Sequence, residues 1–231
     1  MVLRQSRSSS FWRLAVILGA VLLAIASSRP RKGDGQTMTG SQVAHKDNCR
    51  LAVESRIEGQ NVLVVQYTFQ NDAGRDVYVF NRLYKEIVDG PVFDTDPNLV
   101  NVENLAKGIL LSKKIIAVPP DIDVEKPSLP CSSLVKTGGR LMETIRLSLP
   151  LSVWTPYIGH TAKAPPTDVV RRRALFEIGY FVSNSGTQSL AQVVQTKQGE
   201  AFYFDPFPET GQKTIEVELP MEVPILGKPH G

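Results

Sequence analysis

"NVLVVQYTFQNDAGRDVYVFNRL", residues 61–83, decides the fold class that this chain predicts. Apolar side chains alternate with others from Leu63 to Phe69, and a similar run resumes at Val77. A period of two is typical of a strand with one buried face, and β-branched and aromatic residues favour a pleated strand over a helix. Residues 71–74 between the runs have turn chemistry, with a glycine that can take a positive φ. The stretch therefore predicts two strands joined as a β-hairpin.

Segments with the same alternation recur along the chain, separated by turn residues. They show no regular succession of strand, helix and strand, so the pattern predicts an all-β chain of seven to nine short strands packed as an antiparallel β-sandwich. Residues 91–98 and 183–188 are expected to form a loop and a turn, and 99–114 either a short helix or a strand. The predicted strands are 51–57, 63–69, 77–80, 113–118, 141–149, 172–182, 191–196, 200–207 and 213–220.

One resemblance supports this fold class. Residues 62–80 resemble the B–C hairpin of bacterial immunoglobulin-like modules, of the kind found in cell-adhesion-related domains and in the BsuPI-type proteinase-inhibitor family. "RLMETIRLSL" and "ALFEIGYFV" are similar to the later E and F strands of such modules. The resemblance covers a quarter of the chain at most, and the long connection at 150–172 departs from a compact module. It implies an immunoglobulin-like sandwich and assigns no functional residue.

The N-terminus has the composition of an export signal. A basic opening leads into an uninterrupted apolar run at 14–26, which ends in the small-x-small pattern of a signal-peptidase site. As a helix the run is shorter than the roughly 30 Å hydrocarbon core, which favours a cleaved signal peptide at 1–26. The alternative is an uncleaved membrane anchor over 11–28, because the basic residues at 29–32 resist translocation. We therefore expect an exported protein, periplasmic or secreted, or anchored by that segment.

Composition also divides the rest of the chain. Residues 27–48 carry almost no apolar side chains and are predicted to be a flexible linker. The β-sandwich domain is then expected at 49–223, with a frayed tail at 224–231. The formal charge of +3 comes from three arginines that precede residue 27, so the remainder has 23 basic side chains (26 − 3 = 23) against 23 acidic ones. A neutral body does not indicate a nucleic-acid partner.

The chain has two cysteines, Cys49 and Cys131. In an exported protein they are predicted to pair as a disulfide, which would close a long loop and stabilise the fold by roughly 4 kcal/mol. Two buried free thiols are the alternative, because bond geometry cannot be read from sequence.

Catalytic and metal signals are weak. Of the three histidines, His45 and His230 fall in the linker and the tail, and His160 stands alone in a loop with no nucleophile motif near a serine. The acidic loop at 94–98 begins like a calcium loop but lacks the glycine and the glutamate that complete one, and zinc lacks its ligands. We therefore predict no enzyme activity, no metal and no cofactor. A hydrolase with a site near His160 and the acidic loops at 94–98 and 121–125 is the alternative.

The clearest binding signal is the Pro-rich connection at 151–168. Trp154, Tyr157 and Ile158 lie between its prolines, and aromatic residues on a constrained loop are frequent interface anchors. These three residues are the predicted binding site for an envelope or extracellular protein, unless Trp154 and Tyr157 fold back to plug one end of the sandwich. The same aromatics would act as stacking platforms in a carbohydrate-binding module.

Two other segments could form contact surfaces. Residues 201–207 are apolar on both faces and predict either a buried strand or an edge open to strand addition. The arginines at 171–173 are expected to be a solvated strand edge. The predicted function is contact with another protein through the loop or through an edge strand.

Overall fold

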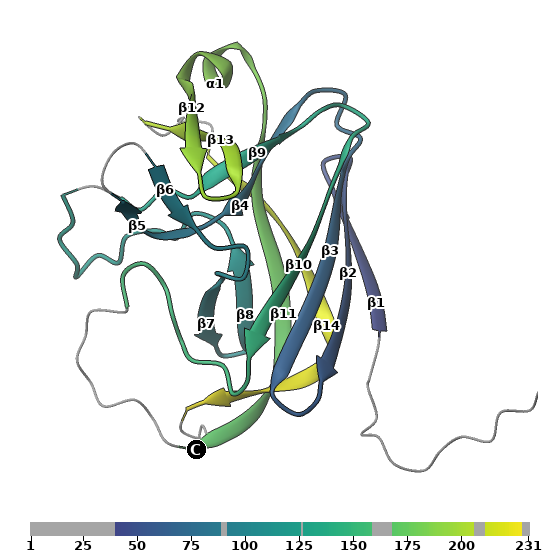
Figure 1. Ribbon diagram of the computed structural model, residues 1–231. Helices are drawn as coiled ribbons and strands as arrows, with labels where there is room; N and C mark the ends of the chain where they lie inside the picture. The colour runs from purple at the N-terminus through teal and green to yellow at the C-terminus, as the bar shows by residue number, and fades with distance from the viewer. Residues whose placement is uncertain (1–39, 89–91, 126, 159–167, 206–210, 228–231) are drawn as a thin grey trace, which may run out of the picture. The chain divides into compact units, whose positions relative to one another are not determined.

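The computed structural model describes residues 40–88, 92–125, 127–158, 168–205 and 211–227, and this part of the chain is all-β (Figure 1). Fourteen strands and one short helix, α1 (Ser185–Leu190), make up its regular structure. The strands are β1 (Gly40–Lys46), β2 (Cys49–Glu58), β3 (Val62–Asn71), β4 (Val77–Arg82), β5 (Tyr84–Val88), β6 (Val92–Thr95), β7 (Asn101–Leu105), β8 (Gly108–Lys113), β9 (Cys131–Val135), β10 (Arg140–Ser148), β11 (Val169–Val182), β12 (Ala191–Thr196), β13 (Gly199–Phe204) and β14 (Lys213–Leu226).

The strands form two sheets. A four-stranded antiparallel sheet has the order β1-β2-β3-β10, and a ten-stranded sheet has the order β5-β6-β12-β13-β9-β4-β11-β8-β7, with β14 on the other edge of β11. The larger sheet is mixed, because β8 runs parallel to β11 and β6 runs parallel to β12. The prediction of a purely antiparallel arrangement is therefore wrong, and the strand count exceeds the expected seven to nine. Strands far apart in sequence pair in parallel here, which local patterns do not reveal.

The stretch 61–83 is not a hairpin, because its two strands belong to different sheets (Figure 1). Asn71, fully buried, ends β3 and holds the crossover in place. Its side-chain Nδ2 donates to the carbonyls of Arg75 (2.8 Å) and Val135 (2.9 Å), and its Oδ1 accepts from the Ala73 N–H (3.0 Å). Gly74 takes the expected positive φ of 73°. The turn chemistry was predicted correctly, but the same chemistry serves a hairpin and an arch between sheets.

The two sheets pack face to face across one apolar core. Alternate residues of β2 and β3 point inward, as their period of two predicts, and meet β11 and β14. Aromatic pairs cross the interface, with ring centroids 5.1 Å apart for Tyr67 and Phe176 and 5.3 Å apart for Phe69 and Tyr180. This core holds the walls of the site described below.

Strand β4 is buried on both faces. Val77 and Val79 contribute to the core between the sheets, whereas Tyr78 and Phe80 belong to a second cluster with Phe181 and Phe204. A third cluster is built around Phe93, Cys131 and Tyr203. The larger sheet therefore has apolar packing on each of its faces.

The predicted linker 27–48 is wrong over residues 40–46, which form strand β1 at the edge of the smaller sheet. Asp47 and Asn48, with φ of 52° and 58°, form the two-residue turn that leads into β2. An edge strand with few buried side chains has little apolar signal, and this is why composition missed it. Residues 27–39, like the predicted signal peptide or anchor at 1–26, lie outside the described residues. No helix in the described part of the chain is long and apolar enough to cross a membrane.

The remaining predictions concern the bounds of single strands, loops and turns. The strands at 51–57, 141–149, 172–182 and 191–196 are confirmed. The ambiguous segment 99–114 is the β7–β8 hairpin, and β8 ends at Lys113, so the strand predicted at 113–118 is wrong. The predicted loop at 91–98 contains β6, the turn at 183–188 enters α1, and β14 extends three residues past the predicted domain end at 223.

Candidate binding groove

The three predicted binding residues differ in how far their side chains are buried. Trp154 is half-buried, and its backbone pairs with that of Val102 through hydrogen bonds of 2.7 and 3.0 Å. Tyr157 is only 6% exposed, and its hydroxyl accepts the Ser128 N–H at 3.0 Å. Ile158 is 44% exposed. The connection is therefore folded back at Tyr157, while binding by these three residues stays a prediction. His160 lies outside the described residues.

The predicted disulfide is wrong, because Cys49 and Cys131 are both buried free thiols. Cys49 lies in the core between the sheets, and Cys131 lies in the cluster around Phe93 and Tyr203, so they occupy different packing environments. Burial raises the pKa of Cys49 to about 11 and that of Cys131 to about 12. Neither thiol is primed as a nucleophile.

A buried charged cluster links the two sheets. The Lys113 side chain is fully buried, and its Nζ donates to the carbonyls of Asn81 (3.0 Å) and Pro97 (2.8 Å) and lies 3.6 Å from Glu143 Oε2. Glu143 also accepts the hydroxyl of Tyr67 at 2.5 Å and the amide of Asn81 at 2.6 Å. Burial lowers the pKa of Lys113 to about 8, although the Glu143 carboxylate opposes this shift.

The cluster is structural in character. Its members come from β3 and β10 of the smaller sheet and from β4 and β8 of the larger one. Lys113 and Glu143 are already bound to protein groups, and removing either one would leave the other buried without its partner. Burial also raises the pKa of Tyr67, which keeps its hydroxyl protonated as the donor to Glu143.

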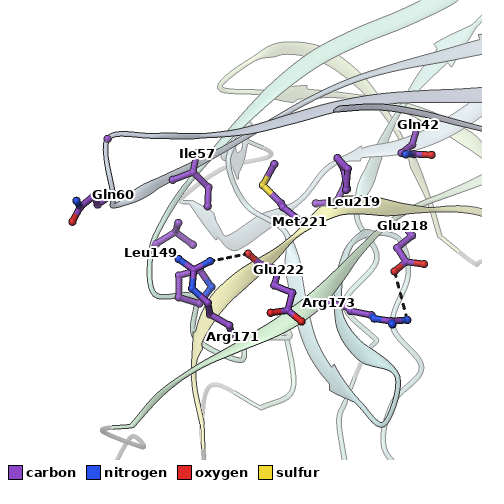
Figure 2. Close-up of a pocket in the computed structure, with 13 residues that line it drawn as sticks. Gln42, Ile57, Gln60, Leu149, Arg171, Arg173, Glu218, Leu219, Met221 and Glu222 are labelled. Atoms are coloured by element: carbon purple, nitrogen blue, oxygen red, sulfur yellow. Dashed lines mark hydrogen bonds and ion pairs between the residues drawn. The ribbon is translucent and has the colours of Figure 1, made fainter. Parts of the chain in front are cut away.

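A groove of about 1020 Å³ opens where the smaller sheet leaves β14 and β11 uncovered (Figure 2). Its apolar floor is made by Ile57 of β2, Leu149 after β10, and Leu219 and Met221 of β14. Leu219 and Met221 are buried, and Ile57 is partly buried. The groove therefore continues the apolar core to the surface, as ligand sites commonly do.

Charged side chains form the rim of the groove (Figure 2). Arg173 Nη1 lies 4.0 Å from Glu218 Oε1, and Arg171 donates to the main-chain carbonyl of Glu222 at 3.4 Å. Along 171–173, β11 pairs with β14 on one side, and its described pairing with β8 on the other side begins only at Ala174, so the arginines do lie at a strand edge as predicted. Arg171 and Arg173 also border the groove.

β1 passes close to β14 at one side of the groove. Gly40, the first residue that the structure describes, pairs with Ser55 of β2. A Cβ on Gly40 would lie 2.4 Å from Cγ of Pro220, and a proline ring cannot swing aside. Glycine is therefore required where β1 passes β14.

The acidic loop at 94–98 is engaged internally. Asp94 forms an ion pair with Lys197 at 2.7 Å, and Asp96 accepts the Asn98 N–H at 2.8 Å. Among the residues with described positions, no group of three or more His, Cys, Asp or Glu side chains is arranged to hold a metal ion.

Sequence reasoning missed the groove. The available signals were Gly40 in a segment taken as linker, and Pro220 and Pro224 in or just beyond the last predicted strand, because both residue types have positional meaning in sheets. Comparisons with protein-family models, with curated proteins and with solved structures found no match. The groove, the strand edges and the surrounding charges are therefore the evidence on function.

Proposed function

We propose that this is an exported protein, periplasmic or secreted, that acts without catalysis by binding an envelope or extracellular protein. The basic opening and the apolar run at 14–26 support export, with attachment through residues 11–28 if that segment is retained. The neutral body supports a protein partner over nucleic acid.

We also propose that the β-sandwich is related to immunoglobulin-like domains. In such domains strands A, B and E share one sheet and strands C, F and G the other. The orders β2-β3-β10 and β4-β11-β14 match those two sets when the strands are taken in chain order. The crossover between β3 and β4 also fits, since strands B and C lie in different sheets. The other eight described strands, β1, β5, β6, β7, β8, β9, β12 and β13, are additions to this plan.

The groove is the observation that carries the proposed function. It combines an apolar floor with a charged rim. An apolar centre inside a polar rim is the usual anatomy of a protein contact surface. Ile158, exposed at the edge of the Pro-rich connection, is the predicted second contact point.

Site-specific photo-cross-linking tests the proposal. A photoreactive amino acid is placed in the full chain at Gln60, which lines the groove and is exposed, and separately at Ile158. The matched control is Met142, which is 62% exposed on the outer face of β10. We expect a discrete cross-linked protein from Gln60 in intact cells and none from Met142. The same products at Gln60 and Met142, or none at Gln60 and Ile158, contradict the proposal.

A further inference from the structure

We infer that the folded chain joins Lys113 of β8 to Asn81 of β4 by an amide bond, which the chain forms itself with release of ammonia. The inference goes beyond the proposed function and does not depend on it, because each chain would react once and would turn over no substrate. Three features of the buried charged cluster support it: the reach of the amine, its hydrogen bonding, and a carboxyl group that contacts both reactants.

The Lys113 side chain already spans the distance from its own strand to Asn81. Strands β8 and β4 lie on opposite sides of β11 in the larger sheet, and Nζ nevertheless donates to the main-chain carbonyl of Asn81 at 3.0 Å. Lys113 is 0% exposed and Asn81 is 1% exposed. The amine and the carboxamide are therefore held close together in a buried site, which raises the effective concentration of two reacting groups.

The hydrogen bonds of Lys113 favour a neutral amine. Nζ donates to the carbonyls of Asn81 and Pro97, whereas Glu143 Oε2, at 3.6 Å, is beyond hydrogen-bond distance. An ammonium group would leave its third N–H without a close acceptor among the described residues, but a neutral amine has its lone pair there. Burial lowers the pKa of Lys113 to about 8, which is the direction that a nucleophilic amine requires.

Asn81 supplies the electrophile. Its Nδ2 donates to Glu143 Oε1 at 2.6 Å, and its buried Oδ1 has no hydrogen-bond partner among the described residues. Buried polar atoms are nearly always paired, so an unpaired one calls for an explanation. A half-turn of the carboxamide would place Oδ1 against Glu143, where a protonated carboxyl group can stabilise the negative charge that develops on this oxygen during attack.

Glu143 can carry the protons that the reaction moves, because its two oxygens face the two reactants. The Lys113 ammonium gives a proton to the carboxylate, and the neutral amine attacks Cγ of Asn81, so that a C–N bond forms and an electron pair moves to Oδ1. The carbonyl then re-forms as the bond from Cγ to Nδ2 breaks. Nδ2 takes the proton from Glu143 and leaves as ammonia, while the attacking nitrogen returns a proton to Glu143. No oxidant or cofactor enters this balance.

The bond would brace the larger sheet. Cys49 and Cys131 are free thiols and supply no covalent link. An amide between β4 and β8 would connect the two strands that flank β11. Reaction converts the Lys113 amine into an amide, so only chain that has not reacted can titrate at Lys113.

Mass spectrometry of a tryptic digest tests the inference on the full chain, folded and incubated at about pH 8. Trypsin does not cleave after an acylated lysine, so we expect peptide 76–82 joined to peptide 108–114, with a mass lower by one ammonia than their sum. Recovery of the two peptides only as separate species would overturn the inference. A loss of water in place of ammonia would also overturn it, because the carboxyl group of Glu143 would then be the electrophile.

Two variants and a matched control assign the roles. Asn81→Ala should abolish the joined peptide, and Glu143→Gln should slow its formation by at least about a hundredfold, because glutamine cannot carry the proton. Lys136→Met removes an exposed lysine, leaves both peptides intact and should not change the reaction. Protection of Cys49 and Cys131 from alkylation shows that a variant is folded. Undiminished formation in a folded Glu143→Gln chain contradicts the mechanism, and the digest of the unaltered chain decides the inference if a variant does not fold.

Discussion

At the residue scale, buried polar side chains hold positions that apolar patterning cannot specify. Asn71 satisfies two main-chain carbonyls and one N–H at the point where the chain changes sheets, and Lys113 satisfies two further carbonyls between the sheets. Each such bond contributes modestly, but an unpaired buried group costs more than the bond is worth. Replacing these residues should therefore affect stability more than replacing exposed neighbours.

Asn71→Ala removes three hydrogen bonds and leaves the carbonyls of Arg75 and Val135 without their side-chain donor. We expect the free energy of unfolding to fall by about 3 kcal/mol, measured by urea denaturation. Gln70→Ala, on the adjacent and partly exposed residue, is the control and should cost less than about 1 kcal/mol. Similar losses in the two variants would show that the crossover does not depend on Asn71.

Lys113→Met should change how stability depends on pH. The pKa of Lys113 is lowered from 10.5 to about 8 in the folded protein, so the unfolded chain binds more protons between these values. The stability that this group contributes therefore rises with pH from about 8, and each pH unit is worth at most about 1.4 kcal/mol.

Burial raises the pKa values of Cys49, Cys131 and Tyr67, so the stability that these groups contribute falls at higher pH. The comparison is therefore made between pH 8 and 9, on chain that retains the Lys113 amine. The groups around Lys113 are Glu143, Tyr67, Arg82 and Asp96. Urea titrations across the window should give a steeper rise for the native chain than for Lys113→Met. Parallel slopes would mean that Lys113 stays charged in the folded protein.

At the element scale, β1 depends on one close approach. Gly40 passes Pro220 so closely that a Cβ would lie 2.4 Å from one ring carbon and 2.8 Å from another. This contact fixes how closely β1 can pack against β14. Strand propensity alone would favour a β-branched residue at this position, but the neighbouring ring excludes one.

Gly40→Val should therefore destabilise the fold by about 1 to 3 kcal/mol despite the better strand former. Ser41→Val, at the exposed next position, is the control and should be nearly neutral. Adding Pro220→Ala should recover part of the loss, and the double-mutant cycle measures the coupling. Additive effects of the two changes would contradict a direct clash.

At the scale of the whole molecule, the apolar clusters on the two faces of the larger sheet share β4 and β11. Val79 and Phe176 face the core between sheets, whereas Phe80 and Phe181 face the second cluster. Packing on both faces of shared strands couples the clusters, so the described part of the chain should unfold in one cooperative transition.

The two thiols test this, because Cys49 lies in the core between the sheets and Cys131 lies in the third cluster, on β9, which pairs with β4. Brief alkylation along a urea series, read by mass spectrometry of the two cysteine peptides, should give the same midpoint for both. Labelling should need no reductant, since both thiols are free. Different midpoints would show that the clusters unfold separately.

Sequence reasoning predicted much of the fold and little of the site. Period-two burial identified β2, β3, β10 and β11, because alternation is local and survives in any sheet. Strands β1, β5, β6 and β9 were missed, since an edge strand buries few side chains and a strand of four or five residues shows little alternation. The groove could not be predicted, because its floor joins Ile57 to Met221 across the two sheets.

The sequence by itself determined that this chain is all-β, which residues face inward on its main strands, and where a glycine turn follows Asn71. Only the tertiary structure decided that this turn crosses between sheets, that Cys49 and Cys131 stay apart, and that Ile57 and Met221 line one open groove. The physical reason is range: side-chain alternation and turn conformation are set by adjacent residues, whereas strand partners are set by packing between distant segments.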